Sequence, residues 1–575
     1  MKRTGLYFGT IILMLPLDSS ALLPNSGTLS NLNENNKKQH IQHQKNNFDQ
    51  IKSNDTYNQS KNDINLQNNT ITLKNLSLDY FHSNDEKLNE KELRELLNPY
   101  IGKKITFNEL SHISKLVEGE IKRKGILLVN AIIPPQNFSS GEIRLNVIQA
   151  RFDSAVLQNT TSVSDSILTG IINNYLTHNE VIKSDKFERL AYLLNELSGI
   201  HATITLIPGS KAGTSSIFID AVKEKDLFFI QSDNYGNDVI GKQRLQVGGY
   251  INSPSGIGDR LSLSIHGTYQ KGEFTGEVID YNFPINYSGA RGWLKNSRID
   301  YKYNFMNSLF QGYSNSFSYG VDVPFVRNNQ WQTDYSISAE HSKMVDNYSG
   351  IFSYAGKKGR KQRDMINGTI KGNLNLDERG IFYFYLGSCL SRVTYKDKAS
   401  EFWNGSDLRN THEPKITHIY DIQYNYPLPN TMLIKARVNG LLTNGNLDSS
   451  QKLMLGGPNG VRGFDGDKHL VDYGYIVNTE ISKVYHENIF ESDIKATIFH
   501  DYGLGYINKN NILKGGQKIN DNNIQKLSSL GFGLSFSATK IGVFDIQWAY
   551  PLSIYNKEQG YNPENKLWIS FSSFF

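Results

Sequence analysis

The chain has 575 residues, a formal net charge of +5 at pH 7 and an aromatic content of 11%. Its length exceeds what one ordinary hydrophobic core accommodates and predicts several structural units. The small net charge is weak support for any nucleic-acid partner, and the single Cys389 excludes an internal disulfide framework.

The N-terminus predicts a secretory signal peptide over residues 1–21. Lys2 and Arg3 precede a mostly apolar run at 6–17, and Ser-Ser-Ala at 19–21 supplies a small-residue cleavage site. A membrane anchor is the alternative, but this run of about 12 residues is shorter than the roughly 20 that cross a bilayer. Mean hydropathy is −0.45 and no long apolar stretch follows, so no helical membrane span is expected.

Residues 22–69 are rich in Asn, Gln, Lys and Ser, as in NENNKKQHIQHQKNN. Such a composition buries too little apolar surface to offset the entropy lost on ordering, so it predicts a linker. A short helix within this segment that plugs a pore remains an open alternative, although no amphipathic period supports it.

Residues 70–150 predict a first mixed α/β module. TITLKNLSLDYF alternates like a strand, and Thr106 with Glu109 forms a plausible capping box ahead of a helix. The segments LLVNAIIP and GEIRLNVIQA then predict two strands joined by a loop. The helix has one apolar stripe, made by Leu110, Ile113, Val117 and Ile121.

Residues 151–225 predict a second module of the same kind. The strand FDSAVL precedes a helix at 165–175, and a further helix ends before Gly199, where a left-handed residue is expected. The strands HATITLI and SSIFIDAV close the unit. Two such modules in tandem constitute a repeat, and their sheet edges are suited to binding extended peptide by strand addition. The alternative is that they are spacers.

From 226 to 575 the helical periodicity disappears and many alternating strands separated by Gly, Asn, Asp and Ser turns are expected. In LIKARVNG the apolar Ile434 and Val438 alternate with Lys435 and Arg437, so one face is apolar and the other polar. At about 20 residues per strand and loop, this length accommodates about 16 antiparallel strands. The fold class expected is therefore α+β repeats followed by an all-β transmembrane barrel, with a soluble all-β sandwich as the alternative.

At this point the chain resembles the two-partner secretion transporters, the ShlB/FhaC/HecB hemolysin secretion/activation group of the POTRA-bearing outer-membrane barrels. Four stretches support the resemblance: NAIIPPQNFSSGEIRLNVIQA, LLNELSGIHATITLIPGSKAGTSSIFIDA, DNYGNDVIGKQRLQVGGYINSPSGIGDRLSLS and LGGPNGVRGFDGD. The last is the most specific, because it contains the VRGF signature of the superfamily. The resemblance implies POTRA domains at 70–150 and 151–225, a barrel at 226–575 and an in-folded loop around 455–467.

The resemblance also implies site residues. The VRGF Arg, here Arg462, meets an acidic residue of an F-x-D-x-G strand motif, here Asp501. Strand parity supports Asp501 independently, because it shares a face with Asp493 and Lys495, opposite Ile494 and Ile498. A guanidinium suits this site because it grips a carboxylate with two parallel hydrogen bonds. The other positions matched to the loop and strand motifs are Val461, Gly463, Phe464, Phe499 and Gly503.

Two further sets are expected from the resemblance. Pro134, Pro135, Gln136 and Gly141 are candidate partner-binding residues of the first POTRA domain, and the terminal Phe575 is the candidate membrane-insertion signal. The structural alternative for the clasp is that VRGF is an ordinary surface turn and Asp501 a solvated charge.

No enzyme site, cofactor or metal is expected. Alternation puts His500 on the face opposite Asp501, no G-x-S-x-G motif is present, and the His residues lack metal-ligand spacing. GGPNGVRG lacks the Lys-Ser/Thr of a phosphate loop.

The expected function is export of an unfolded exoprotein of the hemolysin or adhesin type across a Gram-negative outer membrane, with the POTRA domains in the periplasm and without ATP. The partners expected are that exoprotein with its N-terminal secretion domain, outer-membrane lipid and, during biogenesis, the barrel-assembly machinery, but no nucleic acid. A barrel-assembly insertase is the main alternative and a passive porin another.

Overall fold

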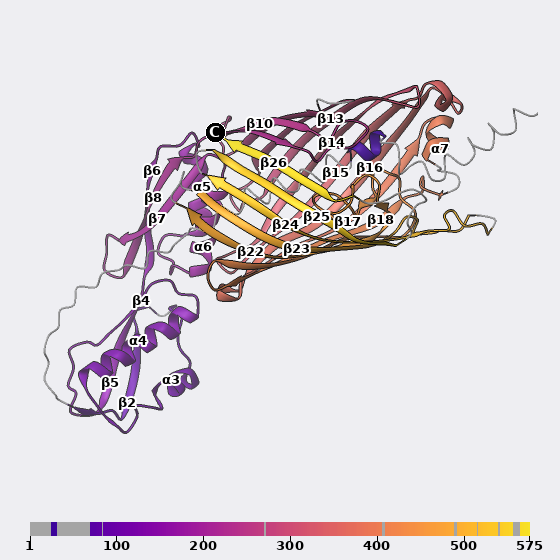
Figure 1. Ribbon diagram of the computed structural model, residues 1–575. Helices are drawn as coiled ribbons and strands as arrows, with labels where there is room; N and C mark the ends of the chain where they lie inside the picture. Colours follow the sequence, from indigo (N-terminus) through magenta and orange to yellow (C-terminus); the bar gives the residue numbers. More distant parts are fainter. Residues whose placement is uncertain are drawn as a thin grey trace, which may run out of the picture. The chain divides into compact units, whose positions relative to one another are not determined.

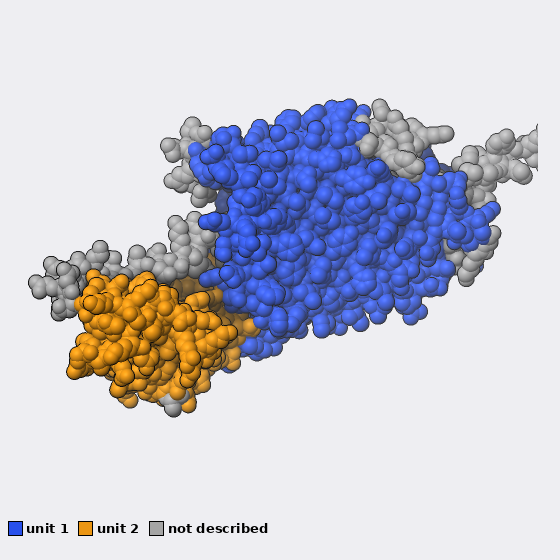
Figure 2. Space-filling view, turned by 90° about the horizontal axis from the view of Figure 1, so that it is seen from below, with its two compact units in different colours: residues 1–47, 225–575 blue, residues 48–224 orange. Residues whose placement is uncertain are grey.

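The computed structural model describes residues 25–30, 70–82, 84–268, 272–404, 409–487, 492–513, 516–538, 541–555 and 564–575. The chain divides into two compact units, one of residues 1–47 with 225–575 and one of residues 48–224 (Figure 2). The signal peptide predicted over 1–21 lies outside the described residues. Among those residues, every helix is too short or too polar to cross a membrane.

The unit of residues 48–224 contains both α/β modules (Figure 1). In the first, β2 and β5 are parallel, and β4 pairs antiparallel with β5 at the edge of the sheet. Thr106 and Glu109 form the predicted capping box at the start of the longer helix, an arrangement that contributes about 1 kcal/mol. The elements are β1 Ile71–Thr72, β2 Asn75–Tyr80, α3 Glu90–Leu97, β3 Lys104–Ile105, α4 Phe107–Arg123, β4 Val129–Ile132 and β5 Glu142–Gln149.

The second module repeats this topology, with strand order β6-β8-β7 and β7 at the edge. Leu190, Leu193 and Leu194 of its second helix are buried against the sheet, and Gly199 follows that helix at φ +88°, as the sequence predicts. The elements are β6 Arg151–Asn159, α5 Asp165–Tyr175, α6 Ser184–Glu196, β7 Ile200–Pro208 and β8 Thr214–Lys223.

Among the described residues, sixteen antiparallel strands form one closed barrel, which confirms the predicted fold class (Figure 1). The strands are β9 Leu227–Asp233, β10 Arg244–Asn252, β11 Arg260–Thr268, β12 Glu273–Pro284, β13 Arg291–Phe305, β14 Ser308–Arg327, β15 Trp331–Asn347, β16 Lys358–Asn375, β17 Ile381–Tyr395, β18 Lys415–Leu428, β19 Met432–Thr443, β22 Tyr473–Glu487, β23 Ser492–Tyr506, β24 Ile524–Ala538, β25 Gly542–Tyr555 and β26 Lys566–Phe574. Short elements in the connections are η3 Gly350–Ser353, η4 Asp377–Arg379, α7 Lys398–Asn404, β20 Leu453–Met454 and β21 Leu470–Val471.

Along the barrel strands, apolar side chains that face lipid alternate with polar side chains that face the lumen. Phe532 and Leu534 are half exposed on the outer face, whereas Lys435 and Arg437 form ion pairs on the inner face with Glu480 and Asp421. The single Cys389 is buried in the barrel wall.

The structure differs from the linker expected over 22–69 in one described part. Residues 26–30 form a turn of helix within the barrel, drawn in indigo in Figure 1, and Ser26 and Leu29 have no exposed surface. The composition argument failed here because the segment does not form a core of its own: its few side chains fit a pocket that the barrel supplies.

Candidate functional site: a loop clasped inside the barrel

The connection between β19 and β22 folds back into the lumen. Val461 and Phe464 of the VRGF sequence have no exposed surface and pack with Leu455, Val471 and Leu527. Within the connection, β20 pairs antiparallel with β21, and the Val461 amide donates to the Leu455 carbonyl oxygen at 2.8 Å. The loop is therefore a packed structure held against the inner wall and not a surface turn.

Arg462 and Asp501 are brought together at the centre of this loop. The guanidinium donates from Nε to Oδ2 at 2.8 Å and from its terminal nitrogen to Oδ1 at 2.7 Å, and the Arg462 amide adds a bond to Oδ2 at 3.0 Å. The two side chains are only 6% and 0% exposed. Phe499, two residues before Asp501 on the same face of β23, places its ring centroid 3.4 Å from the guanidinium carbon.

Several residues that the sequence analysis did not single out complete this site. Asn478 donates to Asp501 Oδ1 at 2.8 Å and to the Gly460 carbonyl at 2.9 Å, while Ser529 donates to Oδ2 at 3.3 Å. Trp568 of the last strand donates from its indole to the Arg462 carbonyl at 2.7 Å. The strand parity used for Asp501 would also have found Asn478, because it is the residue directly opposite on β22.

The second carboxylate of the site is Glu480. It lies 3.0 Å from an Arg462 terminal nitrogen and 3.2 Å from Lys435 Nζ, so it joins the loop to the wall at β19 and β22. Gln547 accepts a longer bond from Arg462 at 3.4 Å. Arg462 thus contacts carboxylates on two strands, and buried charges of this kind are stable only when they are paired.

Two glycines allow the loop to approach the wall. A Cβ on Gly463 would lie 2.8 Å from the Ser529 Cβ and 3.2 Å from the Pro551 backbone, and a Cβ on Gly503 would lie 2.8 Å from a Val461 methyl. Gly463 and Gly503, which the family motifs single out, are therefore positions where backbone and side chain meet too closely for any larger residue.

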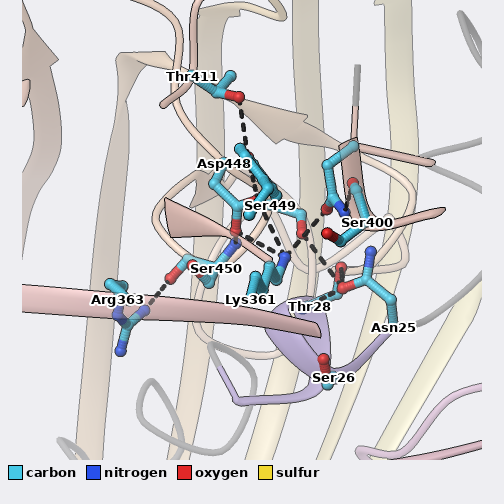
Figure 3. Close-up of polar contacts among 12 residues, drawn as sticks. Asn25, Ser26, Thr28, Lys361, Arg363, Ser400, Thr411, Asp448, Ser449 and Ser450 are labelled. Atoms are coloured by element: carbon cyan, nitrogen blue, oxygen red, sulfur yellow. Dashed lines mark hydrogen bonds and ion pairs between the residues drawn. The ribbon is translucent and has the colours of Figure 1, made fainter. Parts of the chain in front are cut away.

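A second buried ion pair fixes the outer part of the same connection (Figure 3). Lys361 of β16 lies 2.8 and 3.0 Å from the two Asp448 oxygens and 3.0 Å from Asn404 of α7, and Tyr395 donates to Asp448 at 2.9 Å. Burial alone raises the pKa of Asp448, but the Lys361 ammonium outweighs burial and lowers this pKa to about 2. Asp448 is therefore ionised at any physiological pH.

The turn at 26–30 is bound beside this ion pair. The Ser26 amide and hydroxyl donate to the two Asp346 oxygens at 2.9 and 3.0 Å. Ser449 donates to the Asn25 side chain at 3.2 Å (Figure 3). Leu29 packs in an aromatic cluster with Tyr301 and Phe310. Both the turn at 26–30 and the loop thus lie in the lumen.

The remaining predicted site residues are placed as follows. Gln136 exchanges two hydrogen bonds with the Arg144 backbone, at 2.8 and 2.9 Å, and so extends the sheet beyond β4. Gly141, at φ +77°, packs against the Thr72 carbonyl, whereas Pro135 is exposed and Pro134 half-buried. Phe575 is 71% exposed. Gln136 and Gly141 therefore have structural roles, and partner binding at these positions stays a prediction.

Within the described part of the chain, no cluster of three or more His, Cys, Asp or Glu side chains suited to a metal ion is found. His500 lies on the outer face, where it contacts Ser528 at 3.1 Å, away from the clasp.

Comparisons with known proteins agree with this architecture. A family model described as haemolysin secretion/activation protein ShlB/FhaC/HecB matches residues 213–361 and 388–535, and a ShlB-type POTRA model matches residues 79–150. The heme/hemopexin transporter protein HuxB of Haemophilus influenzae is 27% identical over 498 residues, which cover 86% of this chain and 85% of that protein.

Solved structures share the fold. CdiB from Escherichia coli gives a TM-score of 0.72 at 14% identity, covering 96% of this chain and 99% of that one. CdiB from Acinetobacter baumannii gives 0.64 at 16% identity, covering 96% and 99%. With a family model that covers more than half of its length, the chain belongs to the ShlB/FhaC/HecB family of two-partner secretion transporters, outer-membrane barrels with periplasmic POTRA domains.

Proposed function

We propose that this transporter recognises an exoprotein of the hemolysin or adhesin type through its POTRA domains and passes it unfolded through the barrel, without ATP and without catalysing a covalent reaction. The supporting observation is the lumen itself: among the described residues, a loop and a short N-terminal turn lie inside it, and both are held to the wall by non-covalent contacts alone. The exported chain takes their place.

We assign recognition to β7, an edge strand of the sheet in the second POTRA domain. This edge strand has nine residues, against four for β4 in the first domain. Asn195 exchanges hydrogen bonds with the amide and carbonyl of Ala202, so these groups point away from β8. By strand alternation Ile204 presents its amide on the same side, which is what an added strand needs.

The test of recognition uses two substitutions at one position. Ile204→Pro removes the outward N–H, whereas Ile204→Ala removes a similar amount of packing and keeps the N–H. We expect export and partner binding to fall with the proline variant and to survive in the alanine variant, with both folded by circular dichroism. Equal loss in the two variants would contradict strand addition at this edge.

The test of transport is co-expression with the exoprotein from the same locus. Exoprotein in the medium is measured for the wild type, for Arg462→Ala and for a chain lacking both POTRA domains, at equal barrel levels. We expect both changes to reduce secretion. Unchanged secretion together with unfolded accumulation of other outer-membrane barrels would instead favour a barrel-assembly insertase.

A second cargo class follows from one relative. The protein that is 27% identical to this chain is named a heme/hemopexin transporter, so we propose heme or hemopexin binding as a property to test in the exported partner. The medium from the co-expression is incubated with immobilised hemopexin and with heme. Retention of the exoprotein on hemopexin or heme supports the heme/hemopexin class. An exoprotein that binds neither ligand supports the hemolysin or adhesin class.

A further inference from the structure

The outer wall of the barrel contains a groove across β15, β16, β17 and β18. Its volume is about 490 Å³, and Ile337, Ile370, Leu386, Ser388, His418 and Tyr420 contribute to its lining. Ile337 is 69% exposed and Ile370 and Leu386 nearly half exposed, so the groove opens toward the bilayer and not into the lumen.

The groove exists because a glycine stands in the middle of a row of outward residues. The strand registers place Ile337, Gly368, Ser388 and His418 side by side on four neighbouring strands. A Cβ added to Gly368 would meet nothing within 4 Å. The absence of a side chain there leaves a gap between the isoleucine and the serine.

One end of the row is polar although it lies among apolar neighbours. Ser388 Oγ and His418 Nδ1 are 2.9 Å apart, and Nε2 of His418 has no hydrogen-bond partner among the described residues. The next outward side chains along β17 and β18 are less polar. They are Leu390 and Ile416 on one side of the Ser388–His418 pair, and Leu386 and Tyr420 on the other. An imidazole facing hydrocarbon with an unpaired nitrogen is unfavourable, so a ligand that supplies an acceptor or donor stabilises this position.

Positive charge lies beyond the groove, toward the β15–β16 and β17–β18 connections, where Lys343 stands six residues past Ile337 and Arg392 four residues past Ser388. Lys343 and Arg392 face outward there and are exposed, and neither lies within 4.0 Å of a carboxylate in the described residues. Nearby Asp364 is bound to His341 at 2.6 Å. An unpaired arginine and lysine beside an apolar groove are suited to a phosphate attached to an acyl chain.

We propose that this groove binds an anionic lipid of the outer leaflet: one acyl chain lies over Gly368, a polar group near the start of that chain bonds to His418, and a phosphate meets Lys343 and Arg392. Phospholipids and phosphorylated glycolipids share this chemistry. The inference depends on the outer-membrane location and not on the identity of the exported partner.

The test is native mass spectrometry of the full-length protein extracted from outer membranes in mild detergent. We expect the wild type to retain one phosphate-bearing lipid, whose mass distinguishes a phospholipid from a glycolipid. Gly368→Leu puts a side chain into the groove at a position where an added Cβ meets no atom within 4 Å. We expect it to lower lipid occupancy at least about tenfold, since several methylene contacts are lost. Arg392→Gln is expected to weaken retention of the phosphate-bearing lipid.

His500→Leu is the matched control, because it removes an outward histidine, bonded to Ser528, that does not line the groove. Heat-dependent mobility in gel electrophoresis checks that each barrel is folded. Equal lipid occupancy in Gly368→Leu and wild type, or a wild type without bound lipid, would overturn the proposal. So would a wild-type dimer that Gly368→Leu dissociates, because the groove would then bind a second copy of the chain.

Discussion

Replacing Arg462 with alanine tests the clasp most sharply. In the native site the guanidinium and Asp501 are 6% and 0% exposed and joined by two parallel bonds of 2.7 and 2.8 Å. Breaking a buried pair of this kind costs about 3–5 kcal/mol. Asn478 and Ser529 still donate to Asp501 in the variant, so we take the lower end of that range. About 3 kcal/mol corresponds to a roughly 100-fold larger open fraction of the loop.

The open fraction is measured by cysteine labelling from outside the cell. Asn459→Cys places a thiol in the loop, in a background where the buried Cys389 is replaced by alanine, and an impermeant maleimide reports exposure. Arg437→Ala is the control, since it breaks a lumenal bidentate pair with Asp421 that joins two wall strands and not the loop. We expect roughly 100-fold faster labelling in Arg462→Ala and no change in the control. Equal rates in all three proteins would refute the clasp.

Three further outcomes are expected. Gly463→Ala should reduce secretion while leaving the barrel folded, because its Cβ meets Ser529 and Pro551 at 2.8 and 3.2 Å; wild-type secretion would contradict this. Deleting residues 25–30 should raise the conductance of single pores in planar bilayers, because these residues occupy the lumen, and an unchanged conductance would show that they do not obstruct it. The folded pKa of Asp448 is depressed to about 2, so its contribution to stability is present above the unfolded value near 4 and is lost as pH falls toward 2. The labelling rate of a cysteine at Ser449 is divided at each pH by that of a fully exposed cysteine, because the reactive thiolate becomes scarcer in acid. This ratio should stay low at pH 5 and rise between pH 4 and 2, and Lys361→Met should move the rise to higher pH.

The barrel was predictable because apolar and polar residues alternate within single strands. In β24, Phe532 and Leu534 are separated by Gly533, and this period of two indicates which face meets lipid. The same parity rule predicted that Asp501 faces the lumen before any strand pairing was known. The helix over 165–175 was predictable in the same way from local pattern alone. Local periodicity is read directly from sequence because each element repeats it many times.

The partners of Arg462 other than Asp501 were not predicted, because no motif marks them and their meeting depends on closure of the barrel. Gln547 and Trp568 lie 85 and 106 residues beyond Arg462 and reach its guanidinium and its backbone carbonyl from β25 and β26. Glu480 is only 18 residues away, but it lies on the wall strand β22 and meets Arg462 because the loop folds back against that strand. The turn at 26–30 was missed for a related reason: its burial depends on Asp346 and Ser449, more than 300 residues away, and not on its own composition.

The central claim is that the exported polypeptide passes through the lumen, and photo-crosslinking tests it most directly. A photoreactive amino acid is placed at Ser338, which faces the lumen between Ser336 and Glu340, or at Ala339, which faces outward beside Ile366. The barrel is then irradiated during export of the exoprotein. We predict a crosslinked product from position 338 and none from position 339. Crosslinking from 339 alone, or to other outer-membrane barrels in place of the exoprotein, would contradict transport through this pore.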